Sequence, residues 1–174
     1  MEPVIQNENA GTLAASAARE HQAPLLRYAT RIVGDPERAR DVVQDTFLRL
    51  LKQPPAAVNG HVVEWLYTVC RNRALDVLRK EGRMRHFAEG ELENVATVEP
   101  RANRPLEAQE TKAQVLDLIE RLPPNQQEVI RLKFQNGFSY KEISRITDHS
   151  VSNVGFLIHT AVKRLQREFA AQRP

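Results

Sequence analysis

The sequence predicts an all-α protein made of two small helical domains that a flexible linker joins. Only 7 of the 174 residues are glycine and 6% are aromatic, which disfavours sandwiches and barrels with their many turns and aromatic-rich strands. Apolar residues recur at helical spacing in two blocks, about residues 25–80 and 106–169. Residues 86–107 lie between the blocks, show no apolar period and are rich in glutamate, so we expect them to form an acidic linker.

The first block predicts three helices. Residues 1–15 are small and polar and are expected to form a flexible tail. A first helix has apolar residues at helical spacing from Leu25 to Val33, and a second starts at Pro36, for which Asp35 is the predicted N-cap. After a loop over residues 54–61, a third helix is expected over about residues 62–80.

The second block predicts a helix-turn-helix at its end. Ser139 and Glu142 have the spacing of a capping box, which predicts a helix that starts at Ser139. A tight turn around Asp148 leads to Ser150, the predicted N-cap of the last helix. In the DNA-binding form of this motif the second helix enters the major groove. A plain helical hairpin, common in all-helical proteins, fits the same pattern.

Charge adds a second candidate surface. The net charge of +3 and the pI of about 9.2 do not by themselves imply nucleic acid. Residues 71–85 nevertheless have six basic groups, and Trp65 and Tyr67 lie just before them. Single-stranded nucleic acid binds to such combinations, because bases stack on rings while cations hold the backbone. A solvated helix face with core aromatics explains the same residues.

Several functional classes lack support in the sequence. The single cysteine, Cys70, allows no intramolecular disulfide and no multi-cysteine zinc site. We find neither a glycine-rich phosphate loop nor a His-Glu-x-x-His metal motif, and therefore predict no enzyme, cofactor or metal site. Without a signal peptide or an apolar run of about 20 residues, we expect a cytoplasmic protein with no direct membrane insertion.

Three stretches resemble the extracytoplasmic-function (ECF) group of the sigma-70 family. LLRYATRIVGDPERARDVVQDTFLRLL and VVEWLYTVCRNRALDVLRKEGR are similar to sigma domain 2, which docks on RNA polymerase and melts the −10 element. LIERLPPNQQEVIRLKFQNGFSYKEISRITDHSVSNVGFLIHTAVKRLQ is similar to sigma domain 4, which recognises the −35 element. The resemblance covers about residues 20–170. It implies sigma domain 2 over residues 16–85 and sigma domain 4 over residues 108–174.

The resemblance also implies a function and a set of site residues. The protein would bind core RNA polymerase, direct it to promoter DNA and have no active site of its own; an anti-sigma factor is a further partner of the family. The residues implied to dock on the polymerase clamp are Asp41, Gln44, Asp45 and Phe47. Those implied to bind −10 DNA are Asn59, Arg71, Asn72, Asp76, Arg79 and Lys80. Those implied to bind −35 DNA are Lys141, Ser152, Asn153, Phe156, Thr160 and Lys163, and the amides near Ser139 are expected to hold phosphates.

The chain departs from the family pattern in the recognition helix. Gly155, Phe156 and Leu157 stand where the family usually has basic or small polar residues, and whether Phe156 and Leu157 contact DNA or protein stays open. Asp148 replaces the turn glycine and must tolerate a left-handed backbone. Two other functions remain as alternatives: a DNA-binding regulator that uses only the helix-turn-helix, and a helical adaptor that binds protein only.

Overall fold

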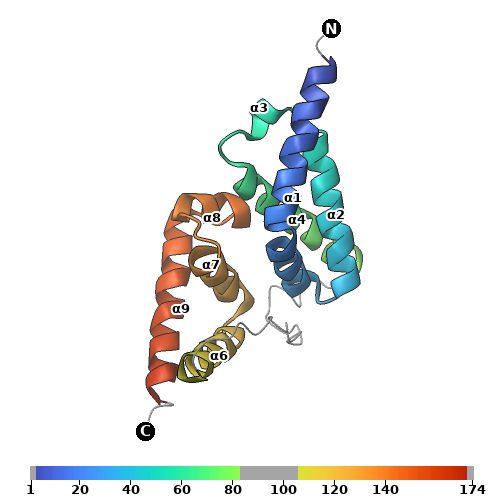
Figure 1. Cartoon of the computed structure of the whole chain (residues 1–174). Helices are drawn as coiled ribbons and strands as arrows, with labels where there is room; N and C mark the ends of the chain where they lie inside the picture. Colours follow the sequence, from blue (N-terminus) through green and yellow to red (C-terminus); the bar gives the residue numbers. More distant parts are fainter. Residues whose placement is uncertain (1–2, 83–105, 172–174) are drawn as a thin grey trace. The chain divides into compact units, whose positions relative to one another are not determined.

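The chain forms two compact helical units, Met1–Arg85 and His86–Pro174, in agreement with the two predicted domains (Figure 1). The computed structural model describes residues 3–82 and 106–171, and all regular structure within these ranges is helical. The predicted linker over residues 86–107 therefore lies outside the described residues, except for its last two, which already belong to a helix. None of the described helices is both long and apolar enough to cross a membrane.

Unit 1 consists of α1 (Pro3–Val33), α2 (Pro36–Leu51), α3 (Pro55–Val58) and α4 (Val62–Lys80). Helices α1, α2 and α4 pack against one another around a core of buried leucine, valine and alanine side chains (Figure 1). The predicted start of α2 is confirmed, since the Asp35 side chain accepts a hydrogen bond from the backbone N–H of Arg38 (2.9 Å).

Two expectations for unit 1 were wrong. Residues 3–15 do not form a flexible tail but belong to α1, and Ala14 is buried. The end of this segment joins the alanines at positions 14, 15, 17 and 18, which favour a helix but contribute little to the apolar period from which we predicted the helices. The loop over residues 54–61 also contains the one-turn helix α3, which contacts α1.

Unit 2 consists of α6 (Leu106–Glu120), α7 (Pro124–Phe134), α8 (Tyr140–Thr147) and α9 (Val151–Ala171). Helix α9 contacts the other three helices (Figure 1). The predicted capping box at the start of α8 is confirmed: the Ser139 hydroxyl accepts from the Glu142 N–H (3.3 Å), and the Glu142 carboxylate accepts from the Ser139 N–H (2.7 Å).

The turn between α8 and α9 has the predicted geometry. Asp148 adopts the left-handed conformation (φ 59°, ψ 25°) at the end of α8. The Ser144 hydroxyl donates to the carbonyl of His149 (2.6 Å), and the Ser150 hydroxyl accepts from the N–H of Asn153 (3.2 Å) at the start of α9. The turn is therefore closed by two side chains in addition to the backbone, and it fixes how α9 leaves α8.

Candidate protein and nucleic-acid interfaces

The outer face of α2 has an acidic and amide surface next to exposed apolar side chains. Asp41 and Gln44 are exposed, while Asp45 and Phe47 are half-buried. Leu48 is 49% exposed and lies one turn after Gln44, so it belongs to the same face, although sequence reasoning did not select it. Leu51, the last apolar residue of α2, is also exposed. All of the predicted docking residues thus border the surface and not the closed core.

An open groove of about 440 Å³ lies between α1 and α2 beside this face. Helix α1 lines it with Ala18, Gln22 and Leu26. Helix α2 lines it with Arg40, Val43, Gln44, Phe47, Leu48 and Leu51. Its lining is mostly apolar and includes the polar side chains of Gln22, Arg40 and Gln44. Protein-binding surfaces with an apolar centre and a polar rim have this composition.

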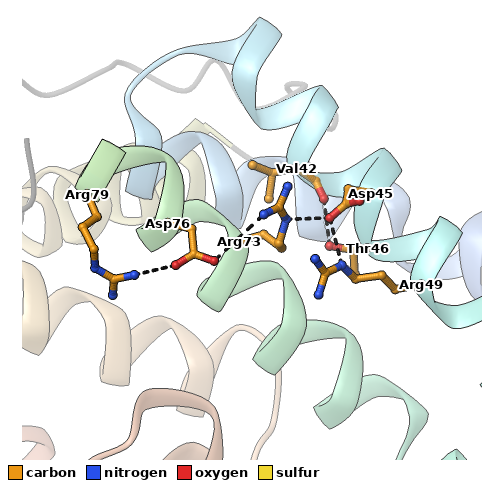
Figure 2. Close-up of polar contacts among 7 residues, drawn as sticks. All are labelled: Val42, Asp45, Thr46, Arg49, Arg73, Asp76 and Arg79. Carbon is orange, nitrogen blue, oxygen red and sulfur yellow. Dashed lines mark hydrogen bonds and ion pairs between the residues drawn. The ribbon is translucent and has the colours of Figure 1, made fainter. Parts of the chain in front are cut away.

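Asp45 is not an isolated acid, because it belongs to a chain of ion pairs between α2 and α4 (Figure 2). Its Oδ2 atom lies 3.0 Å from Arg49 Nε and 2.5 Å from Arg73 Nε. Beyond Arg73, Asp76 lies 3.9 Å from Arg73 Nη1 and 2.6 Å from Arg79 Nη1. Charges of alternating sign therefore connect the docking face of α2 with the basic end of α4.

The predicted −10 residues do not all lie on one surface. On α4, Asn72, Arg79 and Lys80 are exposed and Asp76 is half-exposed, as a polar stripe requires. Arg71 differs from these residues, because it is only 9% exposed and belongs to the buried face of α4. It is the residue next to Asn72, and one step along a helix is a turn of about 100°, so adjacent residues do not share a face.

Tyr67 and Trp65, the two aromatic residues before the basic segment, differ in how deeply they are buried. Tyr67 is buried and packs against Tyr28, with ring centroids 5.0 Å apart, and burial raises the pKa of its hydroxyl to about 12. It is thus a core residue and cannot stack on a base. Trp65 is half-buried. Asn59 is exposed at the end of α3, and its carbonyl accepts a hydrogen bond from His61 Nδ1 (3.1 Å).

Helix α9 divides cleanly into a buried and an exposed face. Val154, Leu157, Ile158 and Ala161 are buried against the rest of unit 2. Ser152, Asn153, Phe156 and Lys163 are exposed and Thr160 is half-buried, so the predicted −35 residues of α9 share the opposite face. The structure separates Phe156 from Leu157: Leu157 is a core residue, whereas Phe156 is 65% exposed and accessible to DNA or protein.

The start of α8 differs from our expectation for phosphate binding. The N–H groups of Ser139 and Glu142 are both occupied within the capping box, and the Glu142 carboxylate lies beside them. These hydrogen bonds with Ser139 lower the pKa of Glu142, so the carboxylate is charged at neutral pH and repels phosphate. Lys141 is exposed next to this end, and the ammonium of Lys133 lies 5.4 Å from the centre of the Tyr140 ring. The capping box thus occupies two of the amides at this end of α8, and the exposed side chain of Lys141 is the cation placed to hold a phosphate there.

Among the described residues, no three histidine, cysteine, aspartate or glutamate side chains gather in a way that could hold a metal ion.

Comparisons with known proteins match both units. The family description Sigma-70 region 2 matches residues 17–84, and Sigma-70, region 4 matches residues 112–165. The ECF RNA polymerase sigma factor SigL of Mycobacterium tuberculosis is 31% identical over 166 residues, which cover 90% of this chain and 92% of the relative. The ECF RNA polymerase sigma factor EcfG of Rhodopseudomonas palustris is 30% identical over 144 residues, 82% of this chain and 77% of the relative.

Solved structures with the same fold include one of a sigma factor in complex with an anti-sigma factor. It is the sigma factor RpoE from Bartonella quintana, crystallised with the anti-sigma factor NepR. The TM-score is 0.64 at 22% sequence identity, and the match covers 91% of this chain and 98% of the other.

Proposed function

Because the chain belongs to the ECF group of the sigma-70 family, whose members direct RNA polymerase to promoters, we propose that it does so through three separate surfaces. One surface docks on core polymerase, one binds the −10 element and one binds the −35 element. The protein contributes recognition and strand separation, while the polymerase contributes catalysis. The observation that supports this best is that unit 1 and unit 2 each expose a polar helix face over a closed apolar core.

The docking surface is the outer face of α2, formed by Asp41, Gln44, Asp45 and Phe47 together with Leu48. Asp41 is the exposed acid that a basic partner surface would meet first. Phe47 and Leu48 supply apolar area at the edge of the groove, and burying that area provides most of the affinity of such an interface.

The −10 surface is formed by Asn59 and the exposed stripe of α4. Arg79 and Lys80 bind the phosphates of the separated strand, and Asn72 contacts a base. Flipping a base out of the stack costs a few kcal/mol, which the pocket must offset. Asp76 acts on Arg79, to which it is paired at 2.6 Å, because a carboxylate in direct contact with phosphate would be repelled. Arg71 remains part of the proposed −10 surface, although it is only 9% exposed.

The −35 surface is the exposed face of α9, with Lys141 and Lys163 as the residues that hold phosphates. Such a protein works in the cytoplasm with the polymerase on the nucleoid. An anti-sigma factor is a further partner in this proposal, since the related RpoE structure contains one. A plain DNA-binding regulator would use α9 alone and leave the α2 face without a role.

The proposal is tested by reconstituted transcription with core polymerase, the full chain and a pool of genomic fragments. Transcripts mapped at their 5′ ends should start downstream of a shared two-part motif, and only when the protein is present. Asp41→Arg should weaken core binding, whereas Glu20→Arg should not, since Glu20 is an exposed acid of α1 and not of the docking face of α2. Failure of the protein to bind core polymerase would overturn the proposal, and DNA binding without polymerase would favour the regulator.

A further inference from the structure

The exposed face of α9 has a phenylalanine at its centre. Ser152 and Asn153 lie one turn before Phe156, and His159 and Thr160 lie one turn after it. All four neighbours are polar and at least partly exposed, while Phe156 itself is 65% exposed. The core does not require this side chain, because Val154, Leu157 and Ile158 close the opposite face.

The same part of α9 has no formal charge. Residues 151–162 contain no lysine, arginine, aspartate or glutamate, and Lys163 is the first charged residue of the helix. Arginine or lysine bound to guanine is the commonest specific contact in the major groove. This stretch of α9 cannot make that contact, so its base recognition rests on hydrogen bonds from uncharged groups and on apolar contact.

Two exposed side chains of α9, those of Asn153 and Phe156, are suited to an A·T base pair. Asparagine binds the N6 and N7 edge of adenine, and an aromatic side chain contacts the C5 methyl group of thymine, the apolar group that the major groove displays. Asn153 and Phe156 are three residues apart, which places them side by side on the face. An A·T pair offers both an adenine edge and a methyl group.

We propose that Phe156 is a specificity-determining residue that contacts a thymine methyl group in the upstream promoter element, so that the element has an A·T pair facing it. This inference rests on the proposed function, because it assigns a base to one residue of the −35 surface. Phe156 then contributes little to polymerase binding and much to the choice of sequence.

The test replaces thymine by deoxyuridine, one position at a time, in the upstream element found by transcript mapping. The exchange removes the methyl group and leaves base pairing and the adenine edge intact. Holoenzyme made with the full chain should bind the promoter about four-fold more weakly when deoxyuridine stands at one or two of these positions. Burial of one methyl group contributes ~0.8 kcal/mol, and 1.4 kcal/mol corresponds to a tenfold change in affinity. With Phe156→Ala, thymine and deoxyuridine should bind equally, and Phe156→Leu should restore part of the preference.

Phe134→Ala is the matched control, since Phe134 on α7 is 64% exposed and lies outside α9. It should keep the full preference for thymine. Equal binding of thymine and deoxyuridine at every position by the unchanged protein would overturn the inference, as would a preference that survives Phe156→Ala. Weaker core binding by Phe156→Ala, with the preference intact in the holoenzyme that still forms, would show a protein contact instead. Holoenzyme that binds no promoter at all would overturn the proposed function itself.

Discussion

The ion pair between Asp45 and Arg73 provides the sharpest test of how α2 and α4 are held together. We predict that the two side chains are energetically coupled, so that removing both charges costs less than the sum of the single changes. The variants are Asp45→Asn, which keeps the shape of the side chain, and Arg73→Met, which keeps the apolar stem of the arginine. The two helices come from separate parts of the sequence, so the pair joins two elements and does not merely support one (Figure 2).

The expected magnitude follows from the geometry. The Arg49 pair is an exposed i,i+4 contact, which typically contributes about 0.3–0.5 kcal/mol. The side chains of Asp45 and Arg73 are 34% and 30% exposed and 2.5 Å apart, so their pair belongs near the upper end of the exposed range, about 1 kcal/mol. Asp45→Asn should therefore lower the free energy of unfolding by about 1–1.5 kcal/mol, with a coupling energy of about 0.5–1 kcal/mol in the double-mutant cycle.

The assay uses the single tryptophan of the chain. Trp65 lies in α4, so its fluorescence during urea unfolding reports on unit 1 without interference from unit 2. Asp41→Asn is the control, because Asp41 is an acid on the same outer face and should change stability by less than about 0.5 kcal/mol. A coupling energy near zero, or a loss in Asp41→Asn equal to that in Asp45→Asn, would refute the reasoning. The cycle also tells whether lost polymerase binding in an Asp45 variant reflects docking or stability.

Four further predictions concern unit 2 and the core of unit 1. Ser139→Ala should destabilise unit 2 by about 1 kcal/mol in urea unfolding followed by circular dichroism. The pKa of Glu142 is lowered in the folded state, so its carboxylate stabilises the fold at pH values above the ordinary glutamate pKa of ~4.3. This stabilisation is lost as the pH falls through the lowered pKa. Glu142→Gln should therefore flatten that part of the acid-unfolding curve. Asp148→Val should destabilise unit 2 by about 1–2 kcal/mol while Asp148→Gly does not, and equal losses would contradict the left-handed turn. Burial raises the pKa of the Cys70 thiol to about 12, so the thiol should resist alkylation at pH 8 until the chain is unfolded. The stability of unit 1 should fall as the pH rises above the ordinary thiol pKa, because only the unfolded chain then loses the proton. Rapid labelling of the folded protein would contradict this prediction.

The helix boundaries that the sequence predicted well are those set by local chemistry. Asp35 before Pro36, the Ser139–Glu142 box and Ser150 all cap helices as expected, because a capping bond involves residues only three apart. The left-handed Asp148 is equally local, since the tightness of the turn requires that conformation whatever lies around it. Interactions of this range can be inferred from residue types alone.

Burial at the edges of helix faces could not be predicted in this way. Arg71 is basic and next to Asn72 in the sequence, yet it is buried, and Leu51 is apolar and exposed. Leu51 is the last residue of α2 and borders its exposed face, whereas Arg71 lies on the buried face of α4, one turn from Tyr67 and Leu75. The position of a helix end and the reach of neighbouring elements decide such cases. A hydrophobic period fixes the centre of each face but not its limits.

Asp41 and Asp45 show the same limit at the candidate site. They are both acids on the outer face of α2, one turn apart, and nothing in the sequence distinguishes their roles. The distinction comes from α4, which brings Arg73 to Asp45 and leaves Asp41 at the exposed surface. A charge that is already paired must give up its partner, or share it, before it can bind another protein, so its gain on docking is smaller than that of an exposed charge. Asp41 should therefore account for more of the electrostatic attraction to polymerase, and Asp45 for the alignment of α2 with the DNA-binding end of α4.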